Sequence, residues 1–140
     1  MARRIDLDDR LLDFAVAVGH IVRRLPLDRL GSHVINQLAR CSTAPAAHYA
    51  EAQGAESRRD FIHKLKLASK ELRESLMWLK YIDRMALVRG KDLSNTQDEC
   101  NQLIAITVKS IQTAQRRART LTTSLFTGSL FAILLFILLI

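Results

Sequence analysis

Apolar residues recur at intervals of three and four along most of the chain before residue 119, and this spacing constrains the fold more than any other feature. It is typical of a helix with one apolar face. Four stretches show the spacing: residues 7–25, which Pro26 is expected to end, residues 28–53, a stretch from Ser57 towards Gly90, and one that begins at Ser94. Four such helices with short links predict an all-α, antiparallel up-down four-helix bundle over residues 1–119.

Individual residues refine these expected helices. Ser57 with Asp60 resembles a cap for the third helix, and Ser94 with Gln97 forms a capping-box pattern for the fourth. Pro45 lies inside the second helix, where it removes one backbone hydrogen bond and predicts a bend. The expected inward residues are Leu11, Phe14, Val18 and Ile21, then Leu30, Val34, Leu38 and Cys41, then Leu65, Leu72, Leu76 and Leu79, and finally Cys100, Leu103, Ile104, Thr107, Ile111, Ala114 and Ala118.

Charge and cysteine content narrow the function classes. The chain carries 21 Lys and Arg against 14 Asp and Glu, a net charge of +7, which favours phosphate polymers, anionic lipid or acidic proteins as partners. Cys41 and Cys100 are too far apart in sequence for a metal knuckle and fall within apolar patterns, so both are expected to be buried reduced thiols. The N-terminal residues lack the apolar core of a signal peptide, and we expect the bundle to reside in the cytoplasm.

Residues 120–140 form a second unit, in which the last twenty residues, Leu121 to Ile140, carry no charged side chain. Twenty helical residues reach about 30 Å, the hydrocarbon thickness of a bilayer. Because Arg116, Arg117 and Arg119 precede this tail, a spanning helix would hold the bundle on the cytoplasmic side of the inner (cell) membrane. The alternative is an apolar helix buried within an oligomer. The residues expected to contact lipid are Leu125, Leu130, Phe131, Ile133, Leu134, Leu135, Phe136, Ile137 and Leu138.

The sequence offers little that is typical of an enzyme. The four histidines lack the spacing of a metal site, and no phosphate loop, dinucleotide turn or nucleophile elbow is present, so no metal, cofactor or catalytic residue is predicted. His48 and Glu51 share a helix face but are more often an exposed contact than a catalytic pair. The carboxylates Glu51, Glu56, Glu71 and Glu74 have basic neighbours and are expected to form a solvated face.

A basic stripe is the one feature that points to a binding function. On the back of the third helix, cationic residues repeat at three, four and seven, opposite the apolar face. Like-charge neighbours one turn apart disfavour the helix slightly, and a phosphate backbone would relieve that repulsion. A merely solvated basic surface is the alternative. No aromatic residue interleaves with the stripe, so stacking on single-stranded bases is not expected. The predicted nucleic-acid-binding residues are Arg59, His63, Lys66, Lys70, Arg73, Lys80 and Arg84, with Arg116 and Arg117 on the fourth helix.

Three segments carry a family resemblance: residues 40–53, 56–68 and 70–79. The resemblance is most specific at Tyr49-Ala-Glu-Ala, Asp60-Phe-Ile-His-Lys and Trp78-Leu. Over about residues 7–118 the chain resembles the bacterial four-helix bundle protein family. That family includes proteins encoded in intervening sequences of ribosomal RNA genes and the accessory variability determinant of diversity-generating retroelements. The resemblance implies a homopentameric barrel, no enzyme activity, and basic surfaces that bind nucleic acid or a nucleoprotein partner. The apolar tail departs from the family pattern.

Two hypotheses follow. In the first, the chain is a non-catalytic, homo-oligomeric adaptor, pentameric by resemblance, that binds nucleic acid or an acidic nucleoprotein partner and is tethered to membrane lipid through residues 121–140. In the second, it is a membrane effector of a defence system, whose clustered tails form a pore or disrupt the bilayer. The tail lacks the polar face expected of a wide aqueous pore, which favours the first.

Overall fold

Four helices make up the part of the chain that the structure describes. The structure is a computed structural model and describes the backbone of residues 6–138 and the side chains of residues 6–116. The helices are α1 (Leu7–Val22), α2 (Arg29–Gln53), α3 (Arg58–Arg84) and α4 (Lys91–Leu138). No strand occurs within residues 6–138. The predicted all-α class is therefore confirmed.

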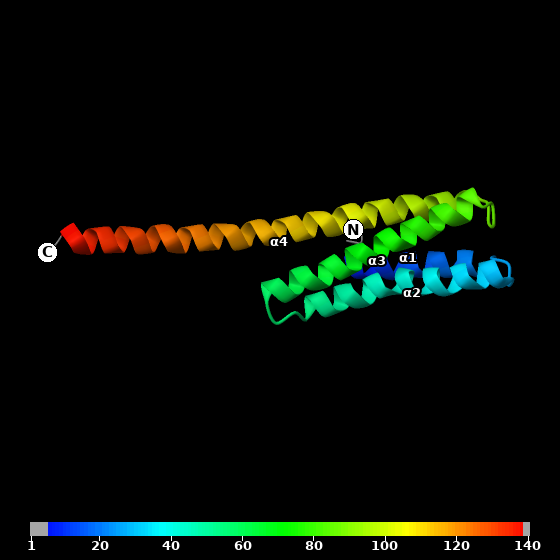
Figure 1. The fold of residues 1–140 in the computed structure, drawn as a ribbon, viewed down its shortest axis with the longest axis horizontal. Helices are drawn as coiled ribbons and strands as arrows, with labels where there is room; N and C mark the ends of the chain where they lie inside the picture. Colours follow the sequence, from blue (N-terminus) through cyan, green and yellow to red (C-terminus); the bar gives the residue numbers. More distant parts are fainter. Residues whose placement is uncertain (1–5, 139–140) are drawn as a thin grey trace, which may run out of the picture.

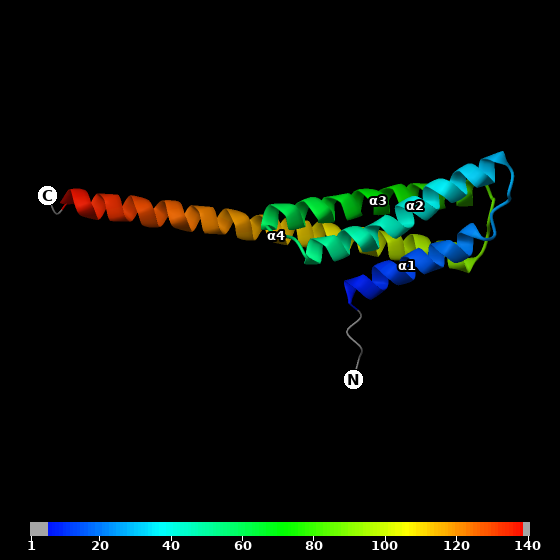
Figure 2. The same cartoon turned by 90° about the horizontal axis from the view of Figure 1, so that it is seen from below.

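The helices pack in chain order around a closed cycle. Contacts join α1 to α2, α2 to α3, α3 to α4, and α4 back to α1. Consecutive helices run in opposite directions and are joined by short loops at residues 23–28, 54–57 and 85–90 (Figures 1 and 2). This is the antiparallel up-down bundle that the apolar spacing predicts.

A single core lies along the axis of the bundle, and all four helices contribute to it. Most of the expected inward residues are buried, which confirms the helical period. Leu30 is an exception, since it is 38% exposed, and the helix turns Gly31 inward in its place. Leu76, Ile104, Ile111 and Ala114 are only partly buried, and Ala118 lies outside the described side chains. The core includes Leu11, Phe14, Val18, Ile21, Val34, Leu38, Cys41, Leu72, Leu79, Ile82, Cys100 and Leu103.

The first helix ends earlier than Pro26 predicts. Helix α1 stops at Val22, and the N–H of its C-cap, Arg23, donates to the carbonyl of Gly19. The chain then turns so that Leu25 stays buried outside the helix. A Cβ on Gly31 would lie 1.8 Å from the Pro26 carbonyl oxygen, so Pro26 packs directly against the first turn of α2.

The fourth helix also begins earlier than the sequence pattern predicts. Helix α3 ends at Arg84, and α4 begins at Lys91, directly after Gly90, whose φ is +140°. Ser94 is therefore inside α4, where its hydroxyl donates to the Lys91 carbonyl at 2.9 Å, and the predicted capping box is wrong. Arg24 holds this turn by bonding the Arg89 carbonyl and the carboxylate of Asp92.

Pro45 lies inside α2, and the helix continues through it from Arg29 to Gln53. The Pro45 side chain is buried against the core. Upstream, Thr43 donates its hydroxyl to the Ala39 carbonyl at 2.9 Å. The bend at Pro45 stays a prediction.

Helix α4 extends far beyond the other three helices (Figures 1 and 2). Its 48 residues compare with 27 in α3, and it is continuous across the predicted boundary at residue 120. Within the part of the chain whose side chains the structure describes, no helix is long and apolar enough to cross a membrane. The predicted lipid-facing residues, Leu125 to Leu138, lie outside the described side chains.

Candidate nucleic-acid interface

Helix α3 is fixed at its start by its own sequence and along its length by the core. The Ser57 hydroxyl accepts a hydrogen bond from the Asp60 N–H at 3.1 Å, which confirms the predicted cap. Leu65, Leu72 and Leu79 are fully buried. With these residues inward, the opposite face of α3 points away from the bundle.

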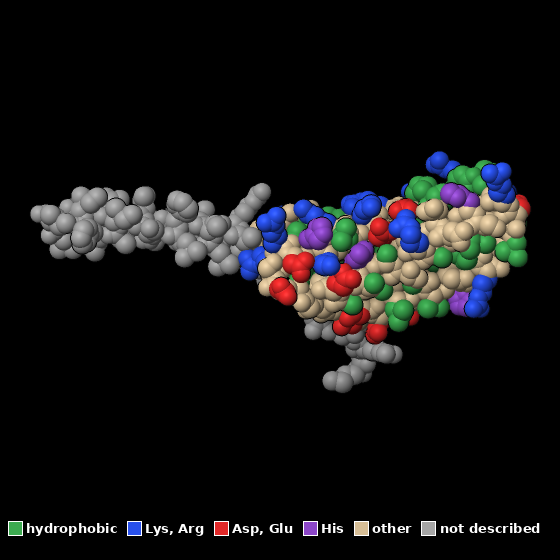
Figure 3. Space-filling model, turned by 60° about the horizontal axis from the view of Figure 1, so that its bottom comes forward, with side chains coloured by type: hydrophobic (Ala, Val, Ile, Leu, Met, Phe, Trp, Pro, Cys, Tyr) green, Lys and Arg blue, Asp and Glu red, His purple; other side chains and the backbone are tan. Residues whose placement is uncertain are grey.

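All seven predicted residues of the α3 stripe are exposed on this outward face. We call them the basic stripe: Arg59, His63, Lys66, Lys70, Arg73, Lys80 and Arg84. From first to last the stripe extends for about 37 Å at the rise of an α-helix. Lys and Arg side chains recur along the upper edge of Figure 3 and at the end from which α4 extends, while acidic side chains gather mainly lower on the face shown. The structure thus confirms the predicted exposure of the stripe, whereas its binding role stays a prediction.

Two acidic residues of α3, Glu71 and Glu74, pair with α2. Arg40 bonds Glu71 at 3.0 Å and Glu74 at 2.5 Å. These two carboxylates also raise the pKa of the Arg40 guanidinium, Glu74 with the larger effect. The Glu71 side chain is only 9% exposed, so it is a buried ion-pair partner rather than part of the expected solvated face.

The stripe cations are therefore left almost without ion-pair partners. Within the described residues, Lys70 is the only stripe residue in an ion pair, at 3.9 Å from Glu71. Arg73 donates to the Ser69 hydroxyl at 2.7 Å, which leaves its charge uncompensated. By contrast, Lys64, one residue off the stripe, pairs with Glu51 at 2.8 Å, and this contact lowers the pKa of Glu51.

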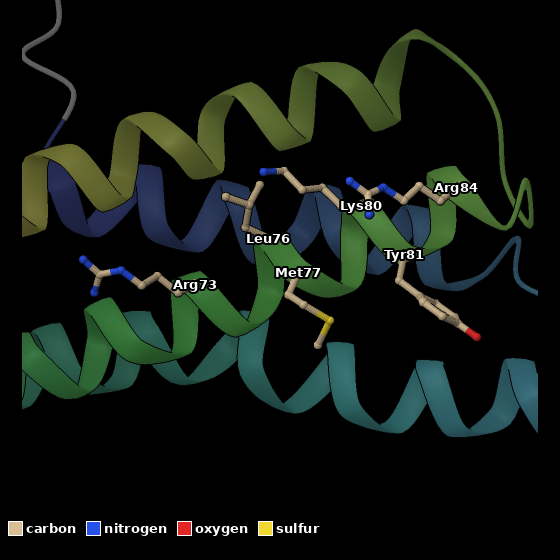
Figure 4. Close-up of a pocket in the computed structure, with 6 residues that line it drawn as sticks. All are labelled: Arg73, Leu76, Met77, Lys80, Tyr81 and Arg84. Atoms are coloured by element: carbon tan, nitrogen blue, oxygen red, sulfur yellow. The ribbon is translucent and has the colours of Figure 1, made fainter.

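A cavity opens beside the C-terminal part of the stripe. It measures about 340 Å³, and its lining comes entirely from α3 (Figure 4). Met77, which is 47% exposed, occupies the stripe position between Arg73 and Lys80. Tyr81 lines the same cavity as the stripe cations, so the expectation that no aromatic residue interleaves with the stripe is wrong at this end. The cavity is lined by Arg73, Leu76, Met77, Lys80, Tyr81 and Arg84.

Tyr81 was missed in the sequence because only the cationic residues were followed along the helix. Tyr81 follows Lys80 and lies 100° further around the helix, which places it at the edge of the stripe. Its ring meets that of Trp78 edge to face, with centroids 5.7 Å apart. Trp78 in turn meets His33 of α2 at 5.6 Å. An aromatic residue adjacent to a stripe cation was the signal available in the sequence.

The arginines of α4 lie at the opposite end of the stripe. Ala114 lines a cavity together with Arg58 and Phe61, so α4 leaves the bundle beside the start of α3. Arg116 follows half a turn later and is exposed. The side chain of Arg117 lies outside the described residues.

The other residues singled out from the sequence form no second site. His48 and Glu51 are neighbours on α2, with Nδ1 and Oε2 3.6 Å apart. Both cysteines are buried free thiols, as predicted, and burial raises the pKa of Cys100 to about 12. Among the described side chains, no three His, Cys, Asp or Glu residues are grouped to hold a metal ion.

Comparison with known proteins supports the family and the fold. The family model for 23S rRNA-intervening sequence proteins matches residues 5–109. The chain belongs to this family. The predicted resemblance is thereby confirmed.

A solved structure shares the fold of this 23S rRNA-intervening sequence protein. It is a protein of unknown function from the S23 ribosomal protein family of Bacteroides thetaiotaomicron, 26% identical in sequence. The match covers 76% of this chain and 98% of that one, with a TM-score of 0.70. No curated protein matches the chain significantly.

Proposed function

We propose that this protein is a non-catalytic adaptor that binds nucleic acid through the basic stripe of α3. The observation that supports this most strongly is the separation of charge on α3. Its buried carboxylate, Glu71, pairs with α2, while its exposed cations face outward with almost no partners.

The physical chemistry of the stripe favours a phosphate backbone. Lys66 and Lys70 are one turn apart and repel each other by a few tenths of a kcal/mol. A polyanion removes this repulsion, and it also releases the counterions that it carries itself. Because the contacts are to phosphates, binding is expected to read little sequence and to weaken steeply with salt. A family named for intervening sequences in 23S rRNA is consistent with such a partner.

Oligomerisation and membrane tethering complete the proposal. The pentamer is the assembly that the sequence resemblance implies. The tether is the uncharged segment 121–140, which follows the Arg-rich end of the bundle segment of α4. A ring of bundles anchored this way would hold several basic stripes close to the cytoplasmic face of the cell membrane.

A charge-reversal variant tests the binding role. Lys66, Lys70 and Arg73 are changed together to Glu, and binding of a labelled 20-base-pair duplex is measured by fluorescence anisotropy at fixed salt. Binding is expected to be lost, because three outward cations become anions while the core is untouched. The matched control changes Arg23, Arg29 and Lys109 to Glu, which alters net charge equally at exposed positions off the stripe.

Equal loss in both variants would show that net charge alone attracts the duplex, and would remove the stripe from the account. Retained binding in the stripe variant would do the same. Particle mass and helical circular dichroism are recorded for each variant, and both are expected to match the unmodified chain.

A further inference from the structure

The basic stripe is not uniform along α3. Its first five members, from Arg59 to Arg73, are all cationic or titratable, and the next position is Met77. From there to Arg84, apolar side chains and cations together line the 340 Å³ cavity; Met77, Lys80 and Arg84 are exposed, and Leu76 and Tyr81 are half-buried. The end of the stripe next to the loop at residues 85–90 therefore offers a ligand apolar and aromatic contacts as well as positive charge.

The cavity separates its two kinds of group in space. Figure 4 shows Lys80 and Arg84 extending on the α4 side of the helix, and Met77 and the Tyr81 ring on the α2 side. No Asp or Glu lines the cavity. Within the described residues, neither Lys80 nor Arg84 takes part in an ion pair, so both cations are available to an anionic ligand.

The aromatic side is held in place before any ligand arrives. The Tyr81 and Trp78 rings are inclined at 81°, and Trp78 is supported by His33 across the α2–α3 seam. A ring fixed in this way loses little conformational entropy on binding. Met77 adds a polarisable sulfur, which contacts flat aromatic groups favourably.

We propose that this cavity is a subsite for an unpaired nucleotide, in which Lys80 and Arg84 bind phosphate and the base packs on Tyr81 and Met77. The proposal rests on the proposed function, because it specifies which nucleic acid the stripe prefers. Single-strand binding surfaces combine cations that follow the backbone with an aromatic ring on which a base stacks. A duplex hides the faces of its bases, so only single-stranded or frayed nucleic acid can use the ring.

The test compares single and double strands on one full-length chain, purified in mild detergent. Kd is measured for a 12-nucleotide oligothymidylate and for a 12-base-pair duplex, at the same salt, with the unmodified chain, Tyr81→Leu and Tyr81→Phe. Tyr81→Leu is expected to weaken single-strand binding by about tenfold, because base stacking on the ring is lost. Duplex binding is expected to stay within about twofold, and Tyr81→Phe, which keeps the ring, to behave as the unmodified chain.

Other outcomes overturn the subsite in distinguishable ways. Equal weakening for both nucleic acids, or none, would show that the stripe binds phosphate alone and that the proposed function stands without the subsite. No binding of either nucleic acid by the unmodified chain would overturn the proposed function itself. An acidic peptide that displaces neither nucleic acid but loses affinity in Tyr81→Leu would assign the cavity to a protein partner instead.

A second measurement uses only the unmodified chain and therefore does not depend on whether a variant folds. The unmodified chain is irradiated with a single strand carrying 5-iodouracil, and the crosslinked peptide is sequenced. Crosslinking at Tyr81 is the expected result. Crosslinking confined to residues outside the cavity would overturn the subsite.

Discussion

Two glycines show how single residues fit this bundle in opposite ways. Gly31 begins the buried face of α2, and an added Cβ would meet the Pro26 carbonyl oxygen at 1.8 Å and its carbon at 2.8 Å. Both are backbone atoms, so no side-chain rotation relieves the clash. Gly19 lies within α1, where an added Cβ meets nothing within 4 Å.

The same substitution is therefore expected to change stability in opposite directions. Gly19→Ala should stabilise the fold by about 0.5–1 kcal/mol, because alanine restricts the unfolded chain and favours the helix. Gly31→Ala should destabilise it by about 1–3 kcal/mol, the typical cost of overpacking. Urea denaturation of both variants measures the difference. A stable Gly31→Ala variant would contradict the packing of Pro26 on α2.

At the scale of the helix, α3 separates a structural face from a binding face. Leu79 is fully buried, and Met77, two residues earlier, is 47% exposed. Leu79→Ala should cost about 2–5 kcal/mol of unfolding free energy through the cavity that it leaves. Met77→Ala should change stability by less than about 0.5 kcal/mol. Similar losses for both variants, measured by urea denaturation, would show that the outward face of α3 also packs.

The sequence predicted helix faces far better than helix ends. Leu65, Leu72 and Leu79 follow the helical period, and burial of one side of a helix follows directly from it. The start of α4 was missed because Ser94 fits a local capping pattern, whereas the turn is fixed by Arg24, which is distant in sequence. Local patterns carry no information about such a contact.

The candidate site was predicted only in part, because local patterns carry no information about contacts between helices. The spacing of the cations placed all seven on one exposed face. It could not show that Glu71 pairs with Arg40, because that ion pair joins α2 to α3. Nor could it show the cavity between Lys80 and Tyr81, which depends on how side chains extend from α3.

At the scale of the whole molecule, the proposed tether makes a direct prediction about location. Leu134→Arg puts a charge near the middle of the uncharged segment, at a cost of about 2.5–3.5 kcal/mol per inserted tail. The variant is expected to leave the membrane fraction. Leu12→Arg is the matched control, since it adds the same charge at a bundle position that is 58% exposed, and it should stay with the membrane. A Leu134→Arg variant that remains membrane-bound would show that the tail is not the anchor.

The central claim is that the α3 stripe binds phosphates, and the salt dependence of binding tests it most directly. The association constant for a duplex is measured across a series of salt concentrations, for the unmodified chain and for a variant with Lys66, Lys70 and Arg73 changed to Gln. The slope of log K against log salt should become shallower by about 2–3 in the variant, since each lost phosphate contact removes about 0.9. Equal slopes for the two proteins would contradict the claim.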